Sequence, residues 1–234
     1  MTTSAAKFDR TRAGEYAEQS RIALAGYDAC HELAACLLSA DLGESLDRRI
    51  LVVGAGGTAQ EILVAGNLRP SWRFLAVDPS PPMLAGAIAS VEAAGLSHLT
   101  TWHSGYVDEL PEANRFDAVT VMGVLHHLRG REAKLALLRA VAARLHPGGT
   151  LILACNRGAY AENPPFLKAW GERWRMAGAS REEVEAKRGK ILQGADPPES
   201  DAAVESLLGE TGFEPPRLFF SSLFWGAWIA RLSA

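Results

Sequence analysis

The chain has 234 residues, of which 48% are hydrophobic and 22% are charged, and its formal net charge is −3. These values predict one soluble α/β domain with a substantial core, and they disfavour nucleic acid as a partner bound through bulk charge. The three cysteines (Cys30, Cys36 and Cys155) fit no metal-binding spacing. No apolar run is long enough for a membrane helix. We therefore expect a cytoplasmic protein with reduced thiols, no metal and no membrane association.

The N-terminal part of the chain has the periodicity of helices. From about residue 8 to residue 40, apolar side chains recur at three- and four-residue spacing, and Gly26 divides the run into two predicted helices. After this stretch, apolar strands alternate with helices. Strands are predicted at 50–53, 74–77, 99–103, 116–122 and 150–155, and helices at 58–65, 81–94 and 131–145. This alternation indicates a parallel sheet covered on both faces.

The C-terminal third departs from this pattern. Residues 156–198 are helical and charged, with no strand signal, which indicates a helical insertion over the sheet. A helix is predicted at 200–210. Two strands follow, with the turn placed at Ser221–Ser222, and their short connection requires an antiparallel pair.

The segment 50-ILVVGAGGTAQE-61 joins the first strand to a helix through a glycine-rich loop. Such glycines let a ligand approach the backbone, and the free N–H groups of the helix start face it. Asp78, at the end of the second strand, can accept hydrogen bonds from ribose hydroxyls. The loop and Asp78 fit either a nicotinamide dinucleotide or S-adenosylmethionine (SAM), and alone they do not choose between them.

Four further motifs follow in order along the chain: 78-DPSPPML-84, 116-FDAV-119, 125-LHHL-128 and 145-LHPGGTL-151. With the terminal antiparallel pair, they resemble the class I SAM-dependent methyltransferases over nearly the whole length. The flanks 8-FDRTRAGEYAEQSRIALAGY-27 and 170-WGERWRMAGASREEVEAKRGKIL-192 resemble the carboxy-SAM synthase of tRNA wobble-uridine modification.

The resemblance implies a doubly wound, Rossmann-like sheet of seven strands, mostly parallel with the last antiparallel, carrying N-terminal helices and a helical insertion after strand five. Residues 1–234 would form one domain, with a helical lid at 1–45 and the insertion 156–198 over the acceptor side. It also implies SAM as cofactor, S-adenosylhomocysteine as product, and direct in-line transfer of the methyl group to a small-molecule acceptor. Neither an oligomeric state nor an acceptor atom is indicated.

The cofactor residues implied by the resemblance come from the glycine loop, the ends of the next strands and the N-terminal helices. They are Gly54, Ala55, Gly56, Gly57, Asp78, Pro79, Met83, Tyr106, Val107, Met122, Gly123 and Tyr27.

Four positions depart from the family pattern. Val52 and Tyr106 stand where acids are usual, Thr58 stands at the third glycine, and Met122 replaces the synthase's asparagine. Backbone N–H groups would then hold the methionine end of SAM, and Tyr106 would pack on adenine. Two alternatives stay open: a carboxy-SAM-synthase-like or tRNA-modifying enzyme, and a SAM-binding module without catalysis.

A hydroxyl acceptor would need a general base, and His126 and His127 follow strand four, where ligands bind in open α/β sheets. The L-H-H-L stretch could instead only shape its loop. Six residues are candidates for the acceptor side, of which Arg188 would bind a carboxylate if it points inward; the aromatic members are equally compatible with a core role. They are Tyr16, Trp170, Trp174, Arg188, Phe220 and Trp225.

Overall fold

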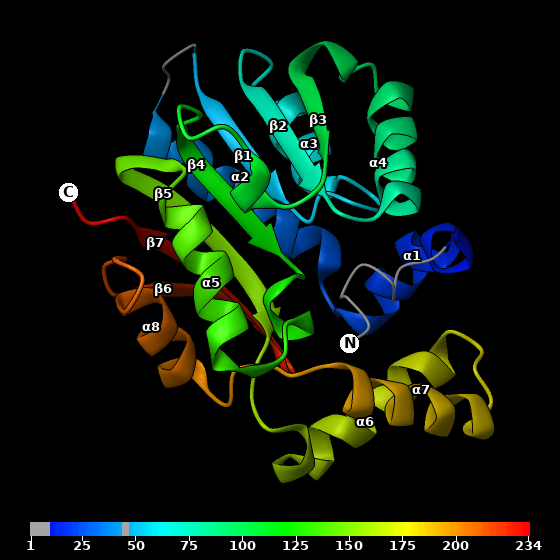
Figure 1. Ribbon diagram of the computed structural model, residues 1–234. Coiled ribbons are helices and arrows are strands. Elements are labelled where there is room, and N and C mark those ends of the chain that lie inside the picture. The colour runs from blue at the N-terminus through cyan, green and yellow to red at the C-terminus, as the bar shows by residue number, and fades with distance from the viewer. Residues whose placement is uncertain (1–9, 44–46) are drawn as a thin grey trace.

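The computed structural model describes residues 10–43 and 47–234. Its strands form one sheet in the order β3-β2-β1-β4-β5-β7-β6. Strands β1 to β5 run parallel to one another, whereas β7 runs antiparallel to both β5 and β6 (Figure 1). The strands are β1 (Arg49–Val53), β2 (Arg73–Asp78), β3 (Thr100–Ser104), β4 (Phe116–Met122), β5 (Leu145–Asn156), β6 (Arg217–Ser222) and β7 (Trp225–Arg231). The predicted fold class is confirmed.

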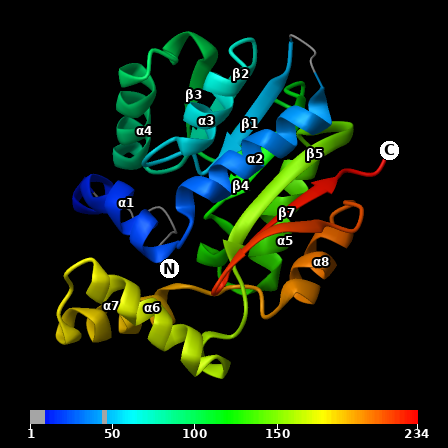
Figure 2. The ribbon, with the colours of Figure 1, turned by 180° about the vertical axis from the view of Figure 1, so that it is seen from behind.

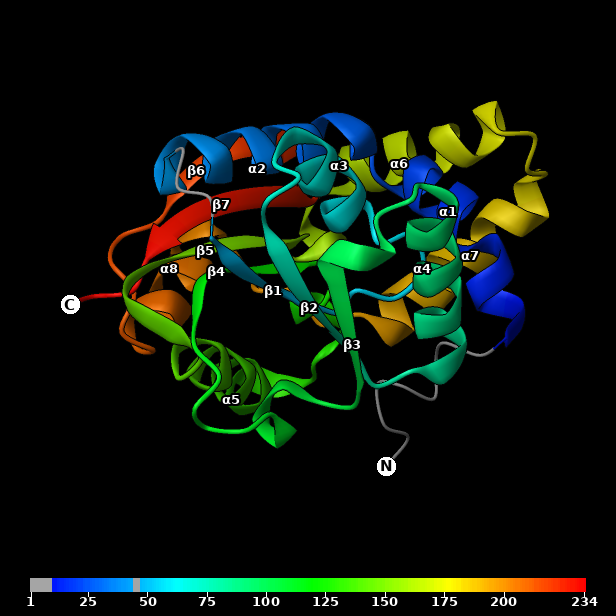
Figure 3. The same ribbon diagram turned by 90° about the horizontal axis from the view of Figure 1, so that it is seen from above.

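Helices cover both faces of the sheet, as Figure 3 shows from above. They are α1 (Arg10–Ala23), α2 (Tyr27–Leu42), α3 (Gln60–Leu68), α4 (Pro81–Ala93), α5 (Gly130–Ala142), α6 (Pro164–Met176), α7 (Arg181–Gly194) and α8 (Asp201–Gly209). Short 3₁₀ turns are η2 (Ser97–Leu99), η3 (Val107–Glu109), η4 (Leu125–His127) and η5 (Tyr160–Glu162). No helix in the described ranges is long and apolar enough to cross a membrane.

Each face of the sheet has its own buried core. Helices α2, α3 and α4 pack on one face, and α5 and α8 on the other, so the central strands β1 and β4 are buried on both sides. Burial on both sides explains why their sequences are apolar without alternation. The helices that follow β1 and β4 leave toward opposite faces (Figures 1 and 2).

A third core lies at the carboxyl ends of the parallel strands. There α6 and α7 pack on each other, and α6 contacts α1 (Figure 2). The indole N–H of Trp170 donates to the carbonyl of Ala23 at 2.7 Å, and the Arg173 guanidinium donates to the carbonyls of Ile22 and Arg21. These bonds join the insertion to the N-terminal helix.

Three predicted boundaries were wrong. The helix expected from Thr58 begins at Gln60, because Ala59 takes a left-handed conformation with φ 49°. Strand β5 begins at Leu145, which pairs with Phe116, so the Pro-Gly-Gly segment lies within the strand. The turn of the last hairpin lies at 223–224 and not at Ser221–Ser222, with Leu223 at φ 49°.

Candidate active site

The candidate site lies where the chain switches from one face of the sheet to the other. Strands β1 and β4 are neighbours, and the loops that follow them touch: a Cβ on Gly54 would collide with the side chain of Val124. In open α/β sheets, ligands bind in the crevice outside the strand ends at such a switch point.

A partly open pocket occupies this crevice. Most of the predicted cofactor residues line it, together with the acceptor candidate Tyr16 and the base candidate His127. Ser80 and Val124 also line it and were not predicted. The lining residues are Tyr16, Gly54, Gly56, Asp78, Pro79, Ser80, Met83, Met122, Gly123, Val124 and His127.

Asp78 is held in place by the backbone at the end of β2. Its Oδ2 accepts the N–H of Gly56 at 2.9 Å, and its Oδ1 accepts the N–H of Ser80 at 2.8 Å. Burial raises the pKa of the Asp78 carboxyl above its ordinary value of 3.8, and the two backbone hydrogen bonds oppose that rise. Each oxygen retains a lone pair that can accept from a ligand hydroxyl.

The glycine loop is packed too closely for side chains. A Cβ on Gly56 would lie 2.5 Å from both the Asp78 Oδ2 and the Met83 Cβ. Gly57 has φ 89°, and a Cβ there would collide with the Tyr16 ring. Tyr16 comes from α1, so the N-terminal helix contributes one wall of the pocket.

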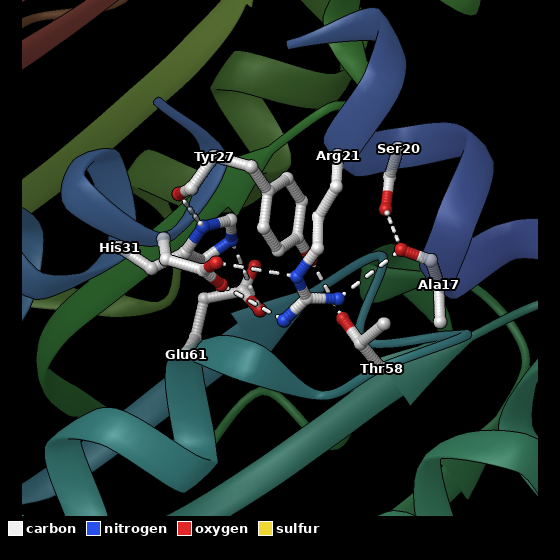
Figure 4. A network of polar contacts seen from close by, with 8 residues as sticks. Ala17, Ser20, Arg21, Tyr27, His31, Thr58 and Glu61 are labelled. Atoms are coloured by element: carbon white, nitrogen blue, oxygen red, sulfur yellow. Dashed lines mark hydrogen bonds and ion pairs between the residues drawn. The ribbon is translucent and has the colours of Figure 1, made fainter. Parts of the chain in front are cut away.

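Thr58 takes part in a polar network that joins three helices (Figure 4). Its hydroxyl shares a 2.7 Å hydrogen bond with the hydroxyl of Tyr27, which is buried. Burial raises the pKa of Tyr27 to about 12. The Arg21 guanidinium lies over the Tyr27 ring and pairs with Asp28. Thr58, the residue at the usual third glycine, therefore joins the loop before α3 to the first residue of α2.

The same network contains a buried acid–base pair. His31 Nδ1–H donates to the carbonyl of Tyr27 at 2.8 Å, and its Nε2 lies 3.9 Å from Glu61 Oε2. Burial raises the pKa of Glu61, and His31 opposes that rise. Val52 lines a small cavity together with His31 and Glu61. Thus Tyr27, predicted as a cofactor residue, lies behind the glycine loop and does not line the pocket.

The two histidines of η4 differ in their surroundings. His126 is buried beside Trp225, with ring centroids 5.7 Å apart, and its Nδ1 accepts the N–H of Asn156 at 3.4 Å. A neutral imidazole that accepts at Nδ1 carries its proton on Nε2, so protonating Nδ1 would break that bond. His127 is only partly buried and lines the pocket.

The predicted acceptor residues do not all come together. Trp170 and Trp174 stack in the core of α6 and α7, with ring centroids 5.3 Å apart, and Phe220 packs against Gly26. Trp225 approaches the pocket, because its ring would lie 3.7 Å from a Cβ on Gly123. Arg188 donates to Glu185 on its own helix at 2.8 Å.

Three cofactor candidates lie beside the pocket lining. Ala55 is buried, and its N–H donates to the carbonyl of Val77; Val107 is buried in the core between the sheet and α5. Tyr106 is 45% exposed, and its backbone N–H donates to Glu109. Their contact with a cofactor stays a prediction.

Comparisons with known proteins match one part of the chain. Residues 51–151, a little under half of the chain, match the family described as "Methyltransferase domain". The matched residues contain the glycine loop, Asp78 and both histidines, and the match implies SAM as the cofactor.

The chain is similar to curated and solved proteins of more than one kind. A tRNA U34 carboxymethyltransferase of Shewanella frigidimarina is 34% identical over 107 residues, which are 46% of this chain and only 31% of that protein. An O-methyltransferase family 2 protein from Planctomyces limnophilus, solved with apigenin, is 16% identical, with a TM-score of 0.69 over 99% of this chain and 62% of the other. Human N-acetylserotonin methyltransferase, solved with SAM, is 15% identical, with a TM-score of 0.66 over 98% and 59%. Both structures share the fold.

We expect Asp78→Asn to weaken SAM binding by roughly tenfold, because a charged hydrogen-bond acceptor is lost. The carboxylate is the accepting form, so wild-type affinity should fall as the pH drops through the raised pKa of Asp78. The asparagine variant should show no such fall. Calorimetry with SAM across the acidic range measures both effects. Asp108→Asn, at an exposed position, is the control, and a parallel pH dependence in wild type and Asp78→Asn would contradict this role.

Trp170 gives a stability prediction for the helical insertion. It is 5% exposed, packs between Trp174 and Phe224, and donates to Ala23. Trp170→Ala should lower the free energy of unfolding by about 3–5 kcal/mol. Met176→Ala, on the same helix but 85% exposed, should stay within about 0.5 kcal/mol of wild type. Denaturant unfolding compares them, and equal effects would show that Trp170 is not a core residue.

Proposed function

We propose that this chain transfers the methyl group of SAM to an uncharged small-molecule acceptor. The observation that carries the proposal is the pocket at the switch point, which has Gly56 and Asp78 on one wall and His127 on another. The close-packed glycine loop leaves its backbone open to a ligand, and the Asp78 carboxylate suits ribose hydroxyls. These features fit SAM.

SAM supplies a methyl group that its sulfonium already activates. The protein therefore has to bind, orient and exclude water, and it needs a base only when the acceptor must lose a proton. His127 would accept that proton at the pocket wall. Burial raises the pKa of Tyr16 far above its ordinary range, and the nearby Tyr27, Glu61 and Asp78 add to the rise, so Tyr16 presents a neutral hydroxyl.

The charge of the pocket supports a cationic cofactor and an uncharged acceptor. Among the described residues that line it, Asp78 is the only carboxylic acid, and none is Lys or Arg. A carboxylate acceptor would find no fixed cation in this lining, whereas an alcohol or phenol would find His127.

The first experiment is calorimetry with SAM, S-adenosylhomocysteine and NADH, followed by a methyl-transfer screen over alcohols, phenols, amines and carboxylic acids. We expect binding of the two SAM species, none of NADH, and transfer to a hydroxyl. Tight SAM binding without transfer to any small molecule would contradict the proposal and favour a binding module.

A tRNA-modifying activity is the second candidate, and the similarity to the tRNA U34 carboxymethyltransferase favours it. Mass spectrometry of the cofactor that co-purifies distinguishes the two candidates. Carboxy-SAM in the protein, or modification of unmodified tRNA, would establish the second candidate, and SAM alone with no tRNA product would exclude it.

A further inference from the structure

The end of the helical insertion lies against the loop that carries the two histidines. After α7, the chain passes beside residues 124–130. These residues connect β4 to α5 and include the first residue of α5, and we call them the histidine loop. The N–H of Asp196 donates to the carbonyl of His126 at 2.8 Å, and the Arg129 guanidinium donates to the carbonyl of Gln193 at 3.1 Å. Two segments about 65 residues apart in sequence are thus bonded side by side.

The Asp196 side chain holds the other end of the same loop. Its Oδ2 accepts the N–H of Gly130 at 2.6 Å and the ammonium of Lys134 at 2.9 Å. Hydrogen bonds from Lys134 and Gly130 lower the pKa of Asp196, outweighing the opposite effect of burial. One residue therefore bonds the histidine loop at His126 through its backbone and at Gly130 through its carboxylate.

Lys134 completes this arrangement from the first turns of α5. Its side chain is 5% exposed, and its ammonium also donates to the carbonyls of Leu128 at 2.7 Å and Gly130 at 3.3 Å. A buried ammonium needs a counter-charge, and Asp196 provides it. The cation and the carboxylate together fix the backbone on the C-terminal side of His127.

We propose that Asp196 is a positioning residue that sets the conformation of the histidine loop, and with it the placement of the His127 ring in the pocket. This proposal depends on the proposed function in one respect only, namely that His127 takes part in methyl transfer. Because Asp196 follows α7 directly, a shift of the insertion on the acceptor side is transmitted to His127 through its bonds to the loop. The helical insertion and the histidine loop then act as one unit.

Amide hydrogen exchange and NMR of the histidine rings test this coupling without any acceptor. In Asp196→Ala, the Gly130 amide loses a charged acceptor and should exchange roughly tenfold faster than in wild type. The His127 ring signals should shift as well. Asp196→Asn keeps an oxygen for Gly130 but loses the pairing with Lys134, so its exchange rate should lie between the two. This milder variant preserves the test if the alanine variant folds poorly.

Glu210→Ala is the matched control. Glu210 has a side-chain exposure of 49%, close to the 46% of Asp196, and its ion pair with Arg131 joins α8 to α5 outside the histidine loop. Unchanged exchange and ring signals in both Asp196 variants would overturn the proposal, and so would an equal increase in Glu210→Ala. With an active acceptor, kcat should fall in Asp196→Ala while the SAM Kd stays within about twofold. Absence of transfer by the wild type would count against the proposed function alone, because the exchange result stands without it.

Discussion

Replacing Gly56 with alanine should weaken SAM binding by roughly 100-fold, the larger end of what forced overpacking costs. The added Cβ would lie 2.5 Å from both the Asp78 Oδ2 and the Met83 Cβ, so the loop or the carboxylate has to move. Either movement breaks the bond from the Gly56 N–H to Asp78. The substitution therefore disturbs the glycine loop and the acid proposed to hold ribose at the same time.

Calorimetry with SAM and thermal unfolding measure this effect together. Gly209→Ala is the control, because it lies in helix α8 and a Cβ there meets no atom within 4 Å. It should leave the SAM Kd unchanged and the stability unchanged or slightly higher. If Gly56→Ala remained folded and bound SAM within about threefold of wild type, the glycine loop would not be the cofactor cradle.

His127→Ala should reduce kcat for a hydroxyl acceptor by about 10²- to 10⁴-fold, the range that general base catalysis supplies. The SAM Kd should change little, since the glycine loop and Asp78 remain intact. Steady-state kinetics with a hydroxyl acceptor, together with calorimetry of SAM binding, checks both statements.

Two further variants separate base catalysis from loop shape. His98→Ala removes an exposed imidazole far from the histidine loop in sequence and should retain full activity. His126→Ala removes a buried ring packed on Trp225, so it should lower the melting temperature. A His127→Ala enzyme that keeps more than a third of the wild-type kcat with a hydroxyl acceptor would leave His127 only a structural role.

The sheet and one wall of the pocket were predictable because local patterns determine them. Strands β1 and β4 are mostly apolar in sequence because they are buried on both faces, and Asp78 ends a strand beside a glycine loop. Parallel strands bring their carboxyl ends to one edge, so the order of the motifs was enough to place Asp78 near Gly56. The 2.9 Å bond between them follows from that topology.

Contacts between distant segments were not predictable in this way. The spacing of Trp170 and Trp174 suits an acceptor pocket as well as a core, and only the packing of α6 on α1 places them in a core. Tyr27 was expected at the cofactor, but Thr58 bonds its hydroxyl behind the loop. Asp196 lies in a segment without periodicity, and its role depends on Gly130, 66 positions earlier.

The antiparallel strand β7 affects how the protein is made. It ends three residues before the C-terminal residue of this sequence, yet it lies between β5 and β6 and covers the whole β5 segment from Thr150 to Asn156. During synthesis, β5 therefore leaves the ribosome with one apolar edge unpaired until about 70 more residues have been added. We expect chains stalled in this interval to aggregate, and deletion of residues 225–234 to destabilise the sheet strongly, because β5 then has no partner on that edge.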